Sequence, residues 1–303
     1  MINSIAYPSQ DALLSKLLPQ NQEFANGKGA AANTRANEQD TSVRVTLSDE
    51  ALSRLEAAKA DPELVKVSYF DKFYPVRDGF SSTNLAAAVT DPGAQPYSQD
   101  RPFEEVAASA RETLDSKYQL MRENGEPYGT HQSGGLDRNS AFGEFDRRAL
   151  YAIASNEGGN FSKDEQMSAT NIMRQQQGHA MGFGSGPTEV AETHVNPHQG
   201  DLASSFKAMN SFLDSVSAEE RATSFEWAQQ RAAGQRAYED HTRQKGEEPE
   251  PFSSDNALLN LFLEAIDSKP DDGSSMSDHL EKYQDRMNAA LQENKKIFGL
   301  ESE

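Results

Sequence analysis

The fold is decided by residues 136–177, LDRNSAFGEFDRRALYAIASNEGGNFSKDEQMSATNIMRQQQ. Apolar residues recur there at helical spacing before and after a short polar segment that contains Gly158 and Gly159. This is the pattern of two helices joined by a loop. Ser162 is placed to cap the second helix, and Asp164 puts negative charge in its first turn, where the helix dipole favours it. The stretch therefore predicts a helix-loop-helix unit.

The first half of this stretch has part of the pattern of a calcium-binding EF-hand loop. Such loops place oxygen ligands at alternate positions, a glycine near the middle, an apolar residue after it and a bidentate Glu at the twelfth position. Asp137 and Asn139 fall on the first and third positions, with one extra residue before the glycine. Phe145 is the apolar anchor and Asp146 begins the exiting helix, but Ala149 stands where the bidentate acid belongs.

The second half, residues 154–165, keeps the end of the same pattern. Gly159 falls at the turn, Phe161 at the apolar position and Glu165 at the twelfth position, while Asn156 is the only side-chain oxygen in the opening half. Together the two segments resemble a degenerate EF-hand region. The resemblance implies calcium as the cofactor, and it implies as ligands Asp137, Asn139, Asp146, Asn156 and Glu165. A helix-loop-helix without metal is the alternative interpretation of the same residues.

An enzymatic alternative rests on residues 153–161, IASNEGGNF. They resemble the glutamate segment at a helix end in lytic transglycosylases and related lysozymes, where the Glu protonates the glycosidic oxygen. Glu157 would then be the general acid of a peptidoglycan-cleaving enzyme. The Gly-Leu-Met-Gln continuation of that family is missing, and the spacing indicates no second carboxylate.

Composition divides the chain into segments and predicts a mainly α, irregular multi-helix assembly. Only 36% of the residues are hydrophobic and 25% are charged, so a sizeable part of the chain cannot pack into a core. We predict four segments: a disordered N-terminal segment, residues 1–42; a helical domain with the EF-hand-like region, residues 43–180; a loop rich in Gly and Pro, residues 181–200; and a helical C-terminal part, residues 201–300.

The loop at residues 181–200 contains two patterns that are typical of binding sites but lack their context. His194 and His198 are four apart, yet Pro197 between them argues against one helix face, so they are predicted to be solvated. Gly182 and Gly184 alternate as in phosphate loops, but no Lys-Ser or Lys-Thr pair follows. We expect a flexible hinge here, and a functional loop is the alternative.

Charge and residue usage exclude several classes of function. With 48 acidic and 29 basic residues the formal charge is -19, which repels nucleic acid and anionic lipid surfaces. The absence of Cys excludes disulfides and thiolate chemistry. No apolar run approaches the roughly 18 residues of a membrane-spanning helix, and the start lacks the pattern of a cleaved signal peptide. The expected location is the cytoplasm, or outside a bacterial cell after export without a cleaved signal.

The resulting functional prediction is a non-enzymatic interaction or regulatory protein. Its helical surfaces are expected to bind a partner protein, and neither nucleic acid nor membrane insertion is expected. A calcium-responsive module is the sharper form of this hypothesis. The peptidoglycan-cleaving enzyme with Glu157 is the alternative.

Overall fold

The computed structural model describes residues 67, 69–129, 135–270 and 275–300. All regular secondary structure in these residues is helical, which confirms the predicted mainly α, multi-helix assembly. The predicted disordered segment, residues 1–42, lies outside the described residues. Among the helices that are described, none combines the length and the apolar character needed to span a bilayer.

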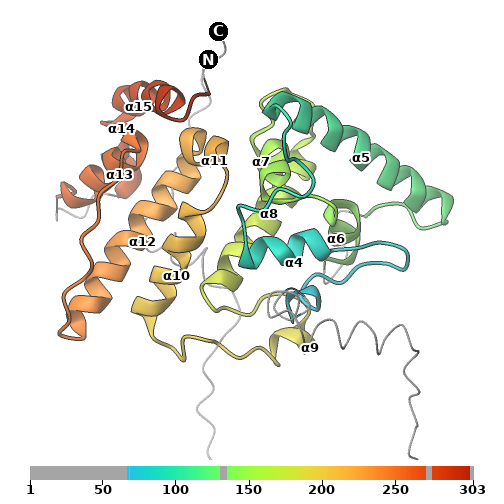
Figure 1. Ribbon diagram of the computed structural model, residues 1–303, viewed down its shortest axis with the longest axis horizontal. Coiled ribbons are helices and arrows are strands. Elements are labelled where there is room, and N and C mark those ends of the chain that lie inside the picture. The colour runs from blue at the N-terminus through green and yellow to red at the C-terminus, as the bar shows by residue number, and fades with distance from the viewer. Residues whose placement is uncertain (1–66, 68, 130–134, 271–274, 301–303) are drawn as a thin grey trace, which may run out of the picture.

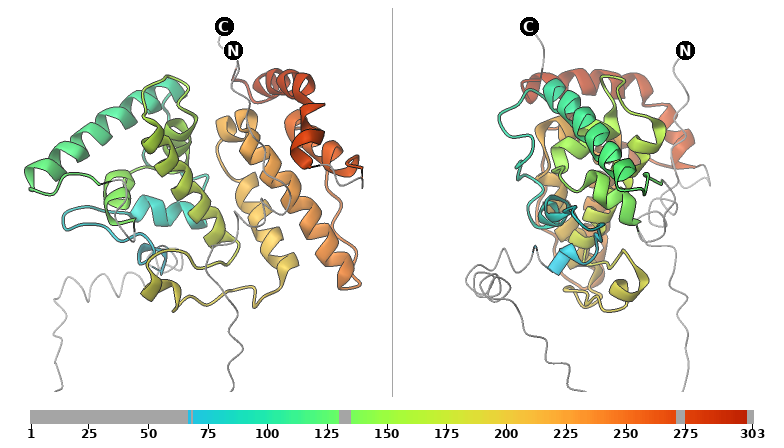
Figure 2. Two further views of the ribbon diagram at one scale, coloured as in Figure 1. Left: turned by 180° about the vertical axis from the view of Figure 1, so that it is seen from behind. Right: turned by 90° about the vertical axis from the view of Figure 1, so that its right-hand side faces the viewer.

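The helices pack as two lobes that lie side by side (Figure 1). The N-terminal lobe contains α4 (Thr83–Thr90), α5 (Phe103–Glu123), α6 (Leu136–Phe142), α7 (Arg147–Ser155) and α8 (Lys163–Ala180). The C-terminal lobe contains α10 (Leu202–Asp214), α11 (Ala218–Thr223), α12 (Phe225–Gln244), α13 (Ala257–Asp267), α14 (Met276–Glu281) and α15 (Gln284–Ile297). The short helix α9 (Thr188–Ala191) lies in the connection. Seen from behind, α8 borders the C-terminal lobe and packs against α10 (Figure 2).

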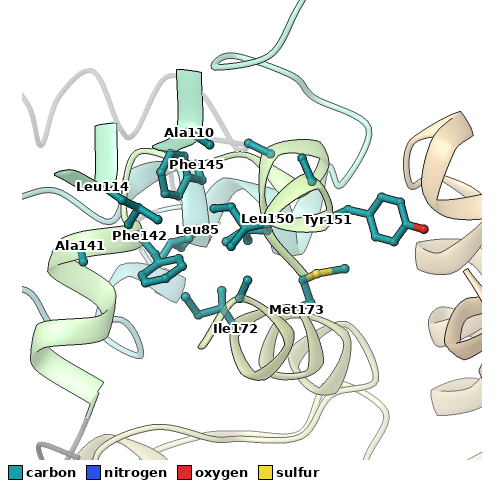
Figure 3. Packing of buried hydrophobic residues seen from close by; sticks show 14 of the residues in the cluster. Leu85, Ala110, Leu114, Ala141, Phe142, Phe145, Leu150, Tyr151, Ile172 and Met173 are labelled. Atoms are coloured by element: carbon teal, nitrogen blue, oxygen red, sulfur yellow. The ribbon is translucent and has the colours of Figure 1, made fainter. Parts of the chain in front are cut away.

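Each lobe has its own apolar core. In the N-terminal lobe Leu85, Leu114, Phe142 and Ile172 are fully buried in one cluster (Figure 3). The residues of the second cluster, among them Phe262, come from the C-terminal lobe and from Met181, just past the end of α8. Two separate clusters mean that apolar packing within a lobe does not by itself fix the position of the other lobe.

Residues 136–177 form three helices where the sequence predicts two. The residues in the first and third positions of the first EF-hand-like segment, Asp137 and Asn139, lie within helix α6 and not in a loop. Helices α7 and α8 are joined by residues 156–162, and this pair is the helix-loop-helix unit. Asn156, at the C-cap of α7, and Gly159 both have positive φ, which lets the chain reverse within the short loop.

Two helical stretches in the C-terminal lobe are each broken into two helices. The helix that begins after Ser217 stops at Thr223, because Ser224 leaves the helical conformation and caps α12 through the amide of Trp227. The helical stretch over residues 276–297 is interrupted at Lys282–Tyr283. There the Tyr283 hydroxyl lies 2.7 Å from Ser268 Oγ at the end of α13, so a side-chain contact between helices outweighs local periodicity.

The connection between the lobes makes close contacts within the described residues, and a flexible hinge stays a prediction. A Cβ atom on Gly184 would lie 2.6 Å from the Cβ of His194, and one on Gly182 would lie 2.7 Å from the side chain of Asn196. His194 is half-buried, its Nε2 is 2.9 Å from the carbonyl oxygen of Gly182, and its Nδ1 is 3.0 Å from the Tyr69 hydroxyl. The prediction of a solvated histidine is wrong for His194, because both of its ring nitrogens contact protein groups. These glycines serve close packing.

A second imidazole anchors the start of this connection. His179, in the last turn of α8, is 3% exposed, and its Nδ1 lies 2.9 Å from the carbonyl oxygen of Phe183. Its ring packs against Phe70 and Phe73, with ring centroids 5.5 and 4.7 Å away. Burial lowers the pKa of His179 from 6.5 to about 4. The folded protein therefore holds this imidazole neutral at pH values where the unfolded chain protonates it.

We expect His179 to make stability depend on pH in mildly acidic solution. Stabilisation by the neutral ring is present above pH 6.5 and is lost as the pH falls through that value toward about 4. This single group lowers the free energy of unfolding by about 3 kcal/mol across that range. Urea unfolding between neutral pH and pH 4.5 measures it, and His179→Gln should flatten the profile. Parallel profiles for His179→Gln and the unmodified protein would contradict the assignment.

Candidate functional site between the two lobes

Asp137 is neutralised by an arginine of the same lobe. Its Oδ1 accepts hydrogen bonds from Arg77 Nε at 2.7 Å and Nη2 at 2.5 Å, and its Oδ2 accepts one from the amide of Gly129 at 2.8 Å. The residue is fully buried. Asn139, two residues further along α6, donates through Nδ2 to the carbonyl oxygen of Pro75 at 3.1 Å, and its Oδ1 has no partner among the described residues.

Asp146 caps helix α7 and accepts four hydrogen bonds. Its Oδ1 accepts from the amide of Ala149 at 2.8 Å. Its Oδ2 accepts from the amide of Tyr97 at 3.0 Å and from the amide and hydroxyl of Ser98 at 2.8 and 2.9 Å. A carboxylate that receives this many donors is saturated by the protein itself. Its role in the structure is to start α7 and to hold the 97–98 segment against it.

The other two predicted ligands lie at the loop between α7 and α8. Asn156 Oδ1 accepts the amide of Phe161 at 2.8 Å. Glu165 completes a capping box with Ser162, and its Oε1 accepts from Arg111 Nη1 at 2.8 Å. Burial raises the pKa of Glu165, but the hydrogen bonds from Arg111 and Ser162 outweigh it and lower the pKa overall. This carboxylate is held ionised by protein donors.

The structure does not gather the predicted calcium ligands into one cage. The described residues contain no group of three or more His, Asp and Glu side chains placed to hold one metal ion. The carboxylates of Asp137, Asp146 and Glu165 each receive donors from the chain, whereas calcium needs six to eight free oxygens. These residues therefore do not fit the ion in this arrangement. Calcium binding stays a prediction.

A pair of arginines at the start of α7 joins the two lobes. Arg147 donates to both carboxylate oxygens of Glu220 on α11, from Nη2 at 2.6 Å and from Nε at 3.0 Å. Both side chains of this pair are 3% exposed. Arg148 donates to a single oxygen of Glu219, Oε1, from Nη2 at 2.6 Å and from Nε at 3.0 Å. We call these two ion pairs the inter-lobe joint.

Further contacts hold the joint in place on both sides. Arg147 Nη1 donates to the carbonyl oxygen of Met173 at 2.7 Å, and Arg148 Nη1 donates to the carbonyl oxygens of Ser98 and Arg101 at 2.9 and 3.0 Å. The Tyr151 hydroxyl lies 2.8 Å from Thr223 Oγ1. Figure 3 shows the Tyr151 side chain leaving the N-terminal core toward the helices of the other lobe.

The joint escapes sequence reasoning because its partners look like helix caps. Ser217 followed three residues later by Glu220 predicts a capping box, and the Ser217 side chain does accept the Glu220 amide. The Glu220 side chain, however, reaches Arg147 on the other lobe. One signal was present: two consecutive arginines next to Ala149 and Leu150 in a helix that is otherwise apolar, since buried arginines require carboxylates.

A groove of about 750 Å³ lies beside the joint between the lobes. Its walls come from the start of α5, from α7, from the loop after α7, from α11, from the last turn of α15 and from Gly299 and Leu300. Phe103, Ala152 and Leu300 contribute apolar surface, and Arg148 and Glu219 lie on one side. Glu157, the general acid of the enzymatic alternative, lines this groove and is exposed.

We expect the Arg147–Glu220 pair to be strongly coupled. Arg147→Met or Glu220→Leu alone leaves an unpaired buried charge and should lower the free energy of unfolding by about 3 to 5 kcal/mol. The double variant should lose clearly less than the sum, because no uncompensated charge remains. Urea unfolding of the four proteins measures the coupling. The half-exposed pair Arg174–Glu226 is the matched control, and its coupling should stay below about 1 kcal/mol. Additive losses at Arg147 and Glu220 would contradict the joint.

Comparisons address whether this arrangement is known from other proteins. No model of a known protein family, no curated protein and no solved structure matches this chain.

Proposed function

We propose that the protein is a non-enzymatic interaction or regulatory protein that takes a segment of a partner protein into the groove between its lobes. The observation that supports this most directly is the groove itself, a hollow of about 750 Å³ with mixed apolar and charged walls. Such a hollow at an interface between lobes is a common place for ligands and partner segments. Its walls belong to both lobes, so the joint holds the groove in shape before binding.

The charges of the groove favour a partner segment with basic side chains. Glu104 and Glu157 line it and form no ion pair within the described part of the chain. Glu219 is neutralised by Arg148, and Lys295 is the remaining cation on the walls. The chain as a whole carries a formal charge of -19, which also attracts basic segments. A segment with Lys or Arg beside an apolar residue would match both the carboxylates and Phe103.

Peptide selection on the intact protein tests this proposal. Peptides selected from a random displayed library should be rich in Lys and Arg, and their affinity should be measured by fluorescence anisotropy. Reversing both groove charges, Glu104→Lys with Glu157→Lys, should weaken binding by at least about tenfold, the size of one desolvated charge contact. The matched control, Glu112→Lys with Glu123→Lys, makes the same change in net charge on α5. Equal losses in both double variants would show non-specific attraction and would remove the groove as the docking site.

Calcium responsiveness would be an added property of the loop between α7 and α8. It is favoured by the left-handed Gly159 and the 5% exposed Phe161 at the positions that an EF-hand loop requires. Binding would need Glu165 to release Arg111. Calorimetric titration of the metal-stripped protein with calcium, and with magnesium as control, tests this property. If neither the unmodified protein nor the Arg111→Met variant releases or absorbs heat on addition of calcium, calcium binding at this loop is excluded.

The placement of Glu157 in the groove favours peptidoglycan cleavage as the second candidate. A glycosidase needs its general acid in a groove that accepts a glycan chain. In that case the unmodified protein would clear a suspension of peptidoglycan, Glu157→Gln would abolish clearing and Glu104→Gln would not. No clearing by the unmodified protein would remove this candidate and leave the interaction protein.

A further inference from the structure

Two imidazoles lie close together where three segments of the chain meet. His179 lies in the last turn of α8, His194 follows α9 in the connection, and their ring centroids are 6.4 Å apart. The third segment, residues 69–74, lies beside α9 (Figures 1 and 2), and its Phe73 ring packs against both imidazoles with centroids 4.7 and 5.6 Å away. The two imidazoles and the side chains that contact their rings form what we call the histidine cluster: His179, His194, Tyr69, Phe73 and Gln175.

Hydrogen bonds hold His194 as a neutral ring. Its Nε2 lies 2.9 Å from the carbonyl oxygen of Gly182, which can only accept, so Nε2 carries the proton. Its Nδ1 then accepts from the Tyr69 hydroxyl, 3.0 Å away. A second proton on this imidazole would have to go to Nδ1, and the Tyr69 hydroxyl would lose its acceptor.

Gln175 opposes protonation of His179 in a similar way. His179 Nδ1 donates to the carbonyl oxygen of Phe183 at 2.9 Å, so its Nε2 is the nitrogen without a proton. Gln175 Nε2 lies 3.5 Å from it and donates to the carbonyl oxygens of Phe73 at 3.1 Å and Ser185 at 3.2 Å. Since both carbonyls only accept, the Gln175 amide must present its NH₂ group here, and a proton on His179 Nε2 would face a donor. The other neighbour, Ser185 Oγ, is also 3.5 Å away, too far for a strong hydrogen bond.

The charges around the histidine cluster do not favour an imidazolium. Lys72 Nζ lies 4.1 Å from the centroid of the Tyr69 ring and 5.0 Å from that of Phe73, which places a positive charge beside the cluster. Burial and, to a smaller extent, the neighbouring His194 lower the pKa of His179 to about 4. Apart from the two imidazoles, the ionisable side chains of residues 69–74 and 175–194 are Tyr69, Asp71, Lys72, Tyr74, Glu189 and Glu192, and of these only Tyr69 hydrogen-bonds to an imidazole within the described residues.

We propose that the histidine cluster is an acid-operated latch, which is closed while both imidazoles are neutral and is opened by their protonation. In the open state residues 69–74 and 183–194 leave the end of α8, and the connection becomes the flexible hinge that its glycines predict. The inter-lobe joint is formed by α7 and α11, so opening the latch does not require the joint to break.

The acid response follows from the proton affinity of the two states. In the open latch His179 returns to its ordinary pKa of 6.5, whereas in the closed latch its pKa is about 4, so the open state binds the proton more tightly. Lowering the pH from 7.5 to 5.5 should therefore increase the open population by about tenfold through His179 alone.

Hydrogen exchange of the intact protein at pH 7.5 and pH 5.5 tests the latch. After correction for the pH dependence of intrinsic exchange, the protection of residues 69–74 and 183–194 should fall by about tenfold and should stay below that of α12. Far-UV circular dichroism should be the same at both pH values, because the helices remain formed. Unchanged protection of the two segments, or equal protection of these segments and α12 at pH 5.5, would overturn the proposal.

Three variants identify the groups that respond to acid. The double variant His179→Gln with His194→Gln removes both proton sites and should remove the pH dependence of protection. Gln175→Glu gives the added proton of His179 a carboxylate partner, so it should also reduce the pH dependence, although the two lost hydrogen bonds loosen the latch at both pH values. His198→Gln is the control, because it removes an imidazole of the same connection that lies outside the histidine cluster, and it should keep the tenfold change. A tenfold fall that persists in the double variant or in Gln175→Glu would contradict the latch.

Discussion

The arrangement of the two lobes depends on the desolvated guanidinium group of Arg147. Removing an arginine from water is costly unless nearly every N–H finds an acceptor. Here Glu220 takes two donors, and Met173 and Gln176 take a third nitrogen. Since Glu220 belongs to the other lobe, the requirement can be met in only one relative position of the lobes. The apolar clusters stabilise each lobe, and the joint selects how they meet.

The joint also divides the space between the lobes into two sites with different properties. Arg148 and Glu219 border the groove, whereas Arg147 and Glu220 border a smaller hollow of about 290 Å³, and Thr223 lines both. Moving the lobes apart would break both ion pairs, so the pairs oppose such a movement. Both hollows therefore keep their shape in the free protein. A preformed site loses less conformational entropy on binding than one that must first assemble. The same contacts therefore specify the fold and preorganise the hollows.

Local rules explain how much of this could be predicted from the sequence. Periodicity and caps predict the helices, as Ser162 and Glu165 show at the start of α8. The joint could not be predicted in this way, because Arg147 and Glu220 are 73 positions apart. The EF-hand-like pattern also comes from residues that cap helices. A carboxylate can cap a helix or bind calcium, so the sequence is compatible with both roles for Asp146. The four hydrogen bonds that Asp146 accepts in the structure identify it as a helix cap.

The internal ion pairs also determine the charge that the protein presents to its surroundings. Arg77, Arg111, Arg147 and Arg148 each engage a carboxylate that is largely buried. Each such pair uses one cation and one anion, so the excess of carboxylates is left on the surface. The field around the protein is then more uniformly acidic than the count of arginines suggests, and it attracts basic segments and repels phosphate backbones. Attraction of this kind weakens with salt. Salt would not weaken contact with apolar groove residues such as Phe103. This contact would therefore distinguish a specific partner from other basic chains.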